Sequence, residues 1–190
     1  DEGGLSPTPE LVEKVRAATS VQLRVMVRLR PGFSTDGGEA IRLRGLIASY
    51  LNAGADGMVL GFLNGLGGVD AGVVTELIQD GSWPWTFHRA IDSCLYLDDG
   101  WEVLATLPRL DQVLTAGSPR GVPHGLDELV SRARGNPWAA GVMMAGGGLR
   151  PEDVPWLARA KTSLNFNRLC CQQWQMTVQP CPSFSTLTRM

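Results

Sequence analysis

The sequence predicts an α/β fold, an incomplete (β/α)8 TIM-type barrel with about five to six of the eight strand–helix units. Short apolar segments rich in β-branched residues alternate with amphipathic segments at helical spacing. This alternation is typical of a parallel sheet whose helices lie outside it. A glycine-rich turn, Gly146–Gly148, follows the last clear strand, where barrels commonly bind phosphate. A doubly wound nucleotide-binding fold usually carries such a turn after its first strand, so the barrel is favoured.

Length and composition restrict the class of protein. The 190 residues are enough for one domain with a sizeable core, and 44% apolar with 19% charged residues fits a soluble globular protein. A net charge of -2 indicates no nucleic-acid partner, and no apolar run approaches the ~20 residues that span a membrane. The four cysteines show no CxxC spacing, so we expect reduced thiols and a cytoplasmic protein.

The first expected elements are a helix and a strand. Thr8 is a preferred N-cap residue and Pro9 suits the first helical position, after which apolar residues recur at helical spacing. The β-branched content of Val21–Arg30 predicts a strand. Its alternation places three arginines on one face, which either borders solvent or delivers arginines to an anionic ligand: Arg24, Arg28 and Arg30.

The later elements continue the same alternation, with Asp70 able to cap one of the helices. In chain order we expect a helix at Glu39–Ala53, a strand at Asp56–Phe62, a helix at Ala71–Gln79, a strand from Trp85, a helix at Trp101–Leu107, a strand at Asp111–Ser118, a helix at Leu126–Ala133, a strand at Ala140–Gly148 and a helix beginning at Pro151.

The segment Trp85–Asp92 contains the most closely spaced candidate functional residues. A bulky apolar strand is followed within five positions by His88, Arg89 and Asp92. A parallel strand is covered on both faces, so its chemistry gathers at its carboxyl end. These groups are either a functional site or satisfied polar side chains at a strand terminus.

Several segments resemble the CutC copper homeostasis family in order and spacing. They are Glu2–Thr8, Val25–Arg30, Gly54–Gly57, Thr86–Asp92, Val113–Gly117 and Met144–Gly148. The resemblance extends from residue 2 to about residue 160, and Glu2–Leu5 with Thr86–Ala90 are its most specific blocks. It implies a (β/α)8-type barrel, cytosolic copper binding and handling, and a homo-oligomer. It supplies no enzymatic activity.

The chain also departs from the family pattern. The family's first two strands precede its Glu-Gly-Gly-Leu loop, where this sequence begins, so the cysteine that ends the second strand is missing. Ala145 stands where the family has proline, and Ser163–Cys171 lacks the expected histidine. We therefore expect a partial CutC-like barrel domain at residues 1–161 and a divergent tail at residues 162–190.

Strand parity and chain position would bring the polar strand ends to one rim of the barrel. Arginines and backbone N–H groups at glycine turns favour a small anion, and His88 is a candidate general acid or base whose ring Asp92 orients. The alternative is a rim of ion pairs without a ligand. The candidate catalytic residues are His88 and Asp92, and the candidate ligand-binding residues are Arg28, Arg30, Arg89, Thr115, Gly117, Gly147 and Gly148.

A copper site would use other residues than the anion site, because Cu(I) prefers thiolate and thioether ligands. Cys94 is the one thiol near the proposed rim and is the candidate metal ligand. Cys170 and Cys171 are adjacent and can chelate together only in a loop. Met143 and Met144 are more typical of core packing.

Three functions follow. The first is a cytosolic copper homeostasis protein without catalytic turnover. The second is a barrel enzyme acting on a small phosphorylated or carboxylated metabolite, with His88 as acid–base. The third is a truncated, non-functional product, in which the loss of two strands would expose sheet edges and cause self-association.

Overall fold

The computed structural model describes residues 4–79 and 81–159, which form one five-stranded parallel sheet with helices. The strands are β1 (Arg24–Met26), β2 (Gly57–Leu60), β3 (Trp85–Phe87), β4 (Leu110–Thr115) and β5 (Met143–Ala145). The helices are α1 (Pro9–Ala18), α2 (Gly37–Asn52), α3 (Ala71–Ile78), α4 (Leu97–Thr106), α5 (Val122–Gly135), α6 (Pro137–Val142) and α7 (Val154–Arg159), with a 3-10 helix, η1, at Arg89–Ser93. The predicted tail at residues 162–190 lies outside the described residues.

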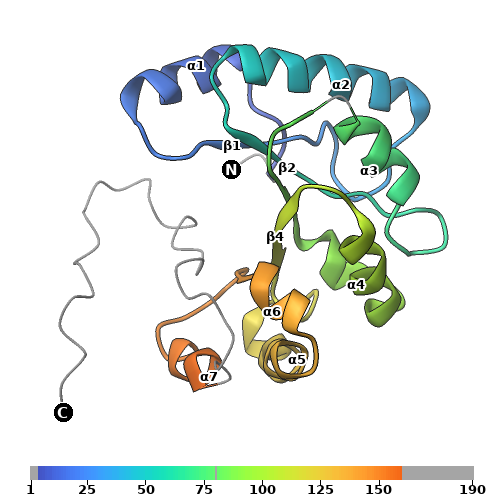
Figure 1. The fold of residues 1–190 in the computed structure, drawn as a ribbon, viewed down its shortest axis with the longest axis vertical. Coiled ribbons are helices and arrows are strands. Elements are labelled where there is room, and N and C mark those ends of the chain that lie inside the picture. The colour runs from blue at the N-terminus through green and yellow to red at the C-terminus, as the bar shows by residue number, and fades with distance from the viewer. Residues whose placement is uncertain (1–3, 80, 160–190) are drawn as a thin grey trace.

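The strands pair in their chain order, β1-β2-β3-β4-β5, and every pair is parallel. The helices lie along the outer side of the curved sheet, from α1 and α2 at one end to α5 and α6 at the other (Figure 1). Within the described residues β1 and β5 each pair on one side only. The predicted fold class is confirmed: five strand–helix units form part of a TIM-type barrel. No helix of this part of the chain combines the length and apolar character needed to cross a bilayer.

The core lies between the sheet and the helices. Val25, Met58, Phe87 and Val113 point to this side and are at most 4% exposed. The opposite, inner face is only partly covered, and one ion pair crosses it. The Arg24 guanidinium donates to both carboxylate oxygens of Asp111, at 2.6 Å each. The terminal nitrogens of Arg24 are therefore held by a partner within the sheet.

Two predicted helix starts are confirmed. The Thr8 hydroxyl accepts from the amide of Leu11, with Pro9 at the first helical position of α1. The Asp70 carboxylate accepts from the amide of Val73 at 3.1 Å at the start of α3. These side chains satisfy amides that the first turn of a helix leaves without partners.

The predicted strand Val21–Arg30 is too long. β1 spans only Arg24–Met26, because side chains take the backbone amides on both sides of it. The Asp56 carboxylate accepts from the amide of Leu23 at 2.7 Å. The Ser6 hydroxyl accepts from the amide of Arg28 at 2.8 Å, so the amino-terminal segment replaces a strand ladder there.

The predicted strand Ala140–Gly148 is wrong in its first half, where α6 occupies Pro137–Val142. Asn136 caps this helix by accepting from the amide of Ala139, and Pro137 takes the first helical position. The apolar run therefore begins as a buried helical turn and becomes extended only at β5. Short apolar segments cannot be assigned to helix or strand by periodicity alone.

The turn after β4 packs directly on α5. Gly117 has φ of +71°, which favours glycine, and a Cβ there would meet the carbonyl oxygen of Gly125. A Cβ on Gly125 would in turn meet the carbonyl oxygen of Ala116 and the backbone of Gly117. The strand end and the helix are thus held at backbone contact.

We expect Gly125→Ala to lower the free energy of unfolding by about 1–3 kcal/mol, because backbone atoms cannot move aside for the methyl group. Urea denaturation measures the change. Gly45→Ala is the matched control, because a Cβ at Gly45 of α2 meets nothing within 4 Å. It should be neutral or stabilising by up to about 1 kcal/mol. Equal effects of the two substitutions would contradict this packing.

Candidate functional site

Most of the predicted site residues lie at the carboxyl-terminal ends of the strands. They form two separate groups, each with one neighbour that was not predicted. The first, the His88 cluster, consists of Arg28, Phe33 and His88. The second, the Asp92 network, consists of Arg89, Asp92, Thr115 and Ala116. The two groups have different chemistry, because the second is satisfied internally and the first is not.

His88 is positioned by the end of β3. Its amide donates to the carbonyl of Leu60 at 3.1 Å, and its side chain caps η1 by accepting at Nδ1 from the amide of Ala90 at 3.2 Å. An imidazole that accepts at Nδ1 carries its proton at Nε2 when neutral. A Cβ on Gly61 would lie 2.7 Å from Nδ1, so the neighbouring strand end must be glycine for this ring to fit.

The Nε2 atom of His88 is buried and has no hydrogen-bond partner in the part of the chain that the structure describes. His88 as a whole is 3% exposed. A buried donor without an acceptor costs about 1–3 kcal/mol, so such a group in a folded protein requires an explanation. Arg24 also has a buried Nε without a partner, but its other nitrogens are held by Asp111 and Thr86 within a closed ion pair.

The pKa of His88 is lowered from 6.5 to about 4, first by burial and then by the positive charge of Arg28. The imidazole is therefore neutral at physiological pH and acts as a hydrogen-bond donor through Nε2. A general base with so low a pKa is poorly matched to neutral pH, so the geometry favours binding over the predicted acid–base role.

Arg28 and Phe33 complete the His88 cluster. The Arg28 guanidinium carbon lies 5.4 Å from the centre of the Phe33 ring, and that ring lies 5.4 Å from the imidazole of His88. Both distances are those of cation–π and aromatic contacts. The aromatic ring thus touches the cation and the neutral donor together. Phe33 was not predicted, although its position in the loop after the arginine-rich strand was a usable signal.

The Asp92 network ties three segments together. The buried carboxylate accepts from the Thr115 hydroxyl at 2.6 Å, from the Ala116 amide at 3.0 Å and from Arg89 Nε at 2.9 Å. The prediction that Asp92 orients the His88 ring is wrong, because the ring is held by the Ala90 amide instead. Asp92 joins the exit of β3 to the end of β4.

Arg89 and the glycine turns after β4 and β5 pack against one another around the Asp92 network. The Arg89 guanidinium donates to the carbonyls of Ser118 and Pro119 at 3.1 Å, and a Cβ on Gly147 would lie 2.7 Å from it. The Gly117 amide donates to the Thr115 hydroxyl at 3.0 Å. These groups, predicted to bind a ligand, make internal contacts in this structure.

Two further predicted ligand-binding residues lie apart from His88. Arg30 pairs with Glu39 at 3.1 Å and with Asp36 at 3.4 Å, at the start of α2. Gly148 has φ of +83° and lies near Pro123 of α5. Of the predicted anion-binding arginines, Arg28 is the one whose charge acts on His88.

Cys94 follows η1 and faces α4. A Cβ on Gly100 would lie 3.2 Å from its Sγ. Burial, and then the charge of Asp92, raise the pKa of the thiol to about 11. Across the described ranges no three His, Cys, Asp or Glu side chains are grouped to hold a metal ion. Cys170 and Cys171 lie outside the described residues.

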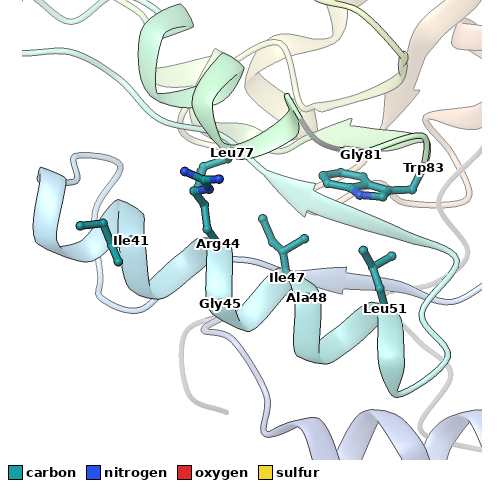
Figure 2. A pocket seen from close by; sticks show the side chains of 9 residues that line it. All are labelled: Ile41, Arg44, Gly45, Ile47, Ala48, Leu51, Leu77, Gly81 and Trp83. Carbon is teal, nitrogen blue, oxygen red and sulfur yellow. The ribbon is translucent and has the colours of Figure 1, made fainter.

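A hollow of about 510 Å³ is lined by none of these residues and lies against helix α2 (Figure 2). One wall is α2, including Ile41, Ile47 and Leu51, and Leu77 and Trp83 face it. Its lining is mostly apolar, so it offers few groups for catalysis or metal binding.

We expect Asp92→Ala to lower the free energy of unfolding by about 2–4 kcal/mol, because it leaves the Arg89, Thr115 and Ala116 donors without their acceptor. Urea denaturation at constant pH measures the loss. Asp127→Ala, at an exposed position of α5, is the control and should change stability by less than about 0.5 kcal/mol. A small effect of Asp92→Ala would show that the network does not hold the strand ends.

His88 should make stability depend on pH. The unfolded chain protonates this imidazole near 6.5 and the folded chain near 4, so the unfolded state binds the extra proton between these values. The contribution of about 3 kcal/mol is fully present above about 6.5 and is lost as the pH falls toward 4.

The measurement is the free energy of unfolding at about pH 7 and about pH 4.5 for the wild type and His88→Gln. The wild type should lose more stability on acidification than His88→Gln, which lacks the titrating ring. His124→Gln, which removes the other of the two histidines, should behave like the wild type. Parallel pH profiles for the wild type and His88→Gln would refute the assignment.

Comparison with known proteins agrees with this architecture. The sequence matches the CutC family over residues 1–167. It is 34% identical over 158 residues to a CutC family protein from Xanthomonas axonopodis pv. citri (strain 306). The alignment covers 81% of this chain and 64% of that protein. It is 31% identical over 164 residues to a CutC family protein from Klebsiella pneumoniae (strain 342), an alignment that covers 84% of this chain and 64% of that protein.

A solved structure of CutC from Streptococcus agalactiae superposes with a TM-score of 0.72 at 20% identity, over 84% of this chain and 79% of that one. At this identity the likeness shows the fold. The chain spans 64% of the length of the Xanthomonas and Klebsiella relatives. The family match covers most of the sequence, and the chain therefore belongs to the CutC family.

Proposed function

We propose that this chain is a cytosolic copper homeostasis protein that binds Cu(I) without catalytic turnover. Membership of the CutC family over residues 1–167 carries the proposal. The Streptococcus agalactiae protein that shares the fold is described as a copper homeostasis protein. Assembly into a homo-oligomer stays a prediction.

Cys94 is the thiol that the described residues offer as a Cu(I) ligand. Cu(I) binds the thiolate, so uptake must displace a proton from a thiol whose pKa is raised to about 11. Affinity should therefore increase with pH. Two-coordinate or three-coordinate binding requires further ligands, and the remaining cysteines, Cys170, Cys171 and Cys181, are candidates in sequence.

We expect the purified reduced protein to take up about one equivalent of Cu(I), and Cys94→Ser to bind it roughly 10-fold or more weakly through loss of a ligand. An anaerobic titration against a chromogenic Cu(I) chelator measures both affinities. Ser93→Ala, an exposed neighbour, is the matched control and should bind like the wild type.

Two outcomes would count against the proposal. Absence of Cu(I) uptake by the wild type would overturn copper binding. Unchanged affinity in Cys94→Ser would overturn the role of this thiol and direct attention to the other cysteines.

A further inference from the structure

We propose that the His88 cluster is a binding site for a small oxyanion, a carboxylate or phosphate group, that accepts hydrogen bonds from Nε2 of His88 and from the guanidinium of Arg28. The site is distinct from copper binding. A guanidinium repels a metal cation, and this part of the rim offers it no thiolate.

The imidazole of His88 has one nitrogen occupied and one nitrogen free to donate to a ligand. Its Nδ1 is occupied by the Ala90 amide, and its Nε2–H is buried without a partner in the described part of the chain. The donor is held rigidly, because the ring caps η1 and packs against Gly61. A buried donor that is fixed in place and lacks an acceptor gains a hydrogen bond when a ligand oxygen arrives, without losing one to another protein group.

The charge that acts on the imidazole is positive. Among the described residues, Arg28 is the charged side chain that lowers the pKa of His88, and its charge is positive. The Nε of Arg28 donates to the carbonyl of Arg30 at 3.0 Å, which orients the guanidinium and leaves its terminal nitrogens as donors for a ligand. A fixed cation beside a neutral donor selects an anion that accepts from both.

The carboxylates of Asp92 and Glu39 are already neutralised by other groups. Asp92 is held by Arg89, Thr115 and Ala116, and Glu39 is held by Arg30 and by the hydroxyl of Thr35. They do not compete for Arg28. The positive charge at the His88 cluster is therefore available to an external anion.

Phe33 gives the site an apolar wall. Its ring contacts both the Arg28 guanidinium and the imidazole, with the same separation of 5.4 Å. An oxyanion bound by Nε2 of His88 and by Arg28 would lie beside this ring.

Histidine labelling provides a direct test, since the chain has only two histidines and His124 is exposed on α5. The protein labelled with ¹⁵N-histidine is titrated with inorganic phosphate, with acetate and with sodium chloride at equal ionic strength, and the imidazole signals are followed by NMR. We expect the His88 Nε2–H signal to shift saturably with phosphate or acetate and not with chloride. The His124 signal should respond equally little to all three salts.

Variants connect the shift to the proposed donors. Arg28→Gln should weaken the apparent affinity about 10-fold or more, because a charge-assisted hydrogen bond is lost. Arg134→Gln removes an exposed arginine of α5 and should leave the affinity unchanged. Preservation of the His88 signal in the ligand-free Arg28→Gln spectrum shows that the variant is folded.

The outcomes separate the alternatives. Saturation with phosphate alone assigns a tetrahedral oxyanion, and saturation with acetate alone assigns a carboxylate. The proposal is overturned if neither anion shifts His88, if chloride shifts it equally, or if Arg28→Gln binds as tightly as the wild type. Copper uptake is measured independently, so failure of one proposal does not affect the other.

Discussion

The carboxylate of Asp92 is the contact on which the arrangement of the strand ends depends. It lies in the 3-10 helix that follows β3, and it accepts from the hydroxyl of Thr115 and the amide of Ala116 at the end of β4. Arg89 compensates its charge and reaches onward to the carbonyls of Ser118 and Pro119. A single buried anion thus connects two strand exits and the loop that leads to α5, and the desolvation of that anion is offset by three donors.

This network divides the rim by chemistry. In the Asp92 network, the groups that were predicted to bind a ligand have protein partners. Arg89, Thr115 and Gly117 therefore stabilise the fold. On the other side His88 retains a buried N–H without an acceptor beside the charge of Arg28. Rigid support next to an unsatisfied donor is the usual organisation of a binding site, because the support keeps the donor oriented before the ligand arrives.

The sequence indicated where the polar strand ends lie but not which of their side chains contact one another. His88 and Asp92 are four positions apart and were expected to interact. In a 3-10 helix, however, residues three apart lie above one another, so Asp92 meets Arg89. His88 stands before that helix in extended conformation and turns to cap it. The contact of Phe33 with His88 joins residues far apart in the chain, so spacing alone did not indicate it.

Local patterns were sufficient for the alternation of strands and helices, for the caps at Thr8 and Asp70, and for the polar exit of β3, because each depends on neighbours within a few residues. Long-range packing settled the rest. The Ser6 and Asp56 side chains, which come from distant parts of the chain, shorten β1. The ion pairs between arginines and carboxylates were likewise decided by the tertiary structure. An arginine pairs with the carboxylate that the fold brings within reach, and spacing along the chain does not specify that partner.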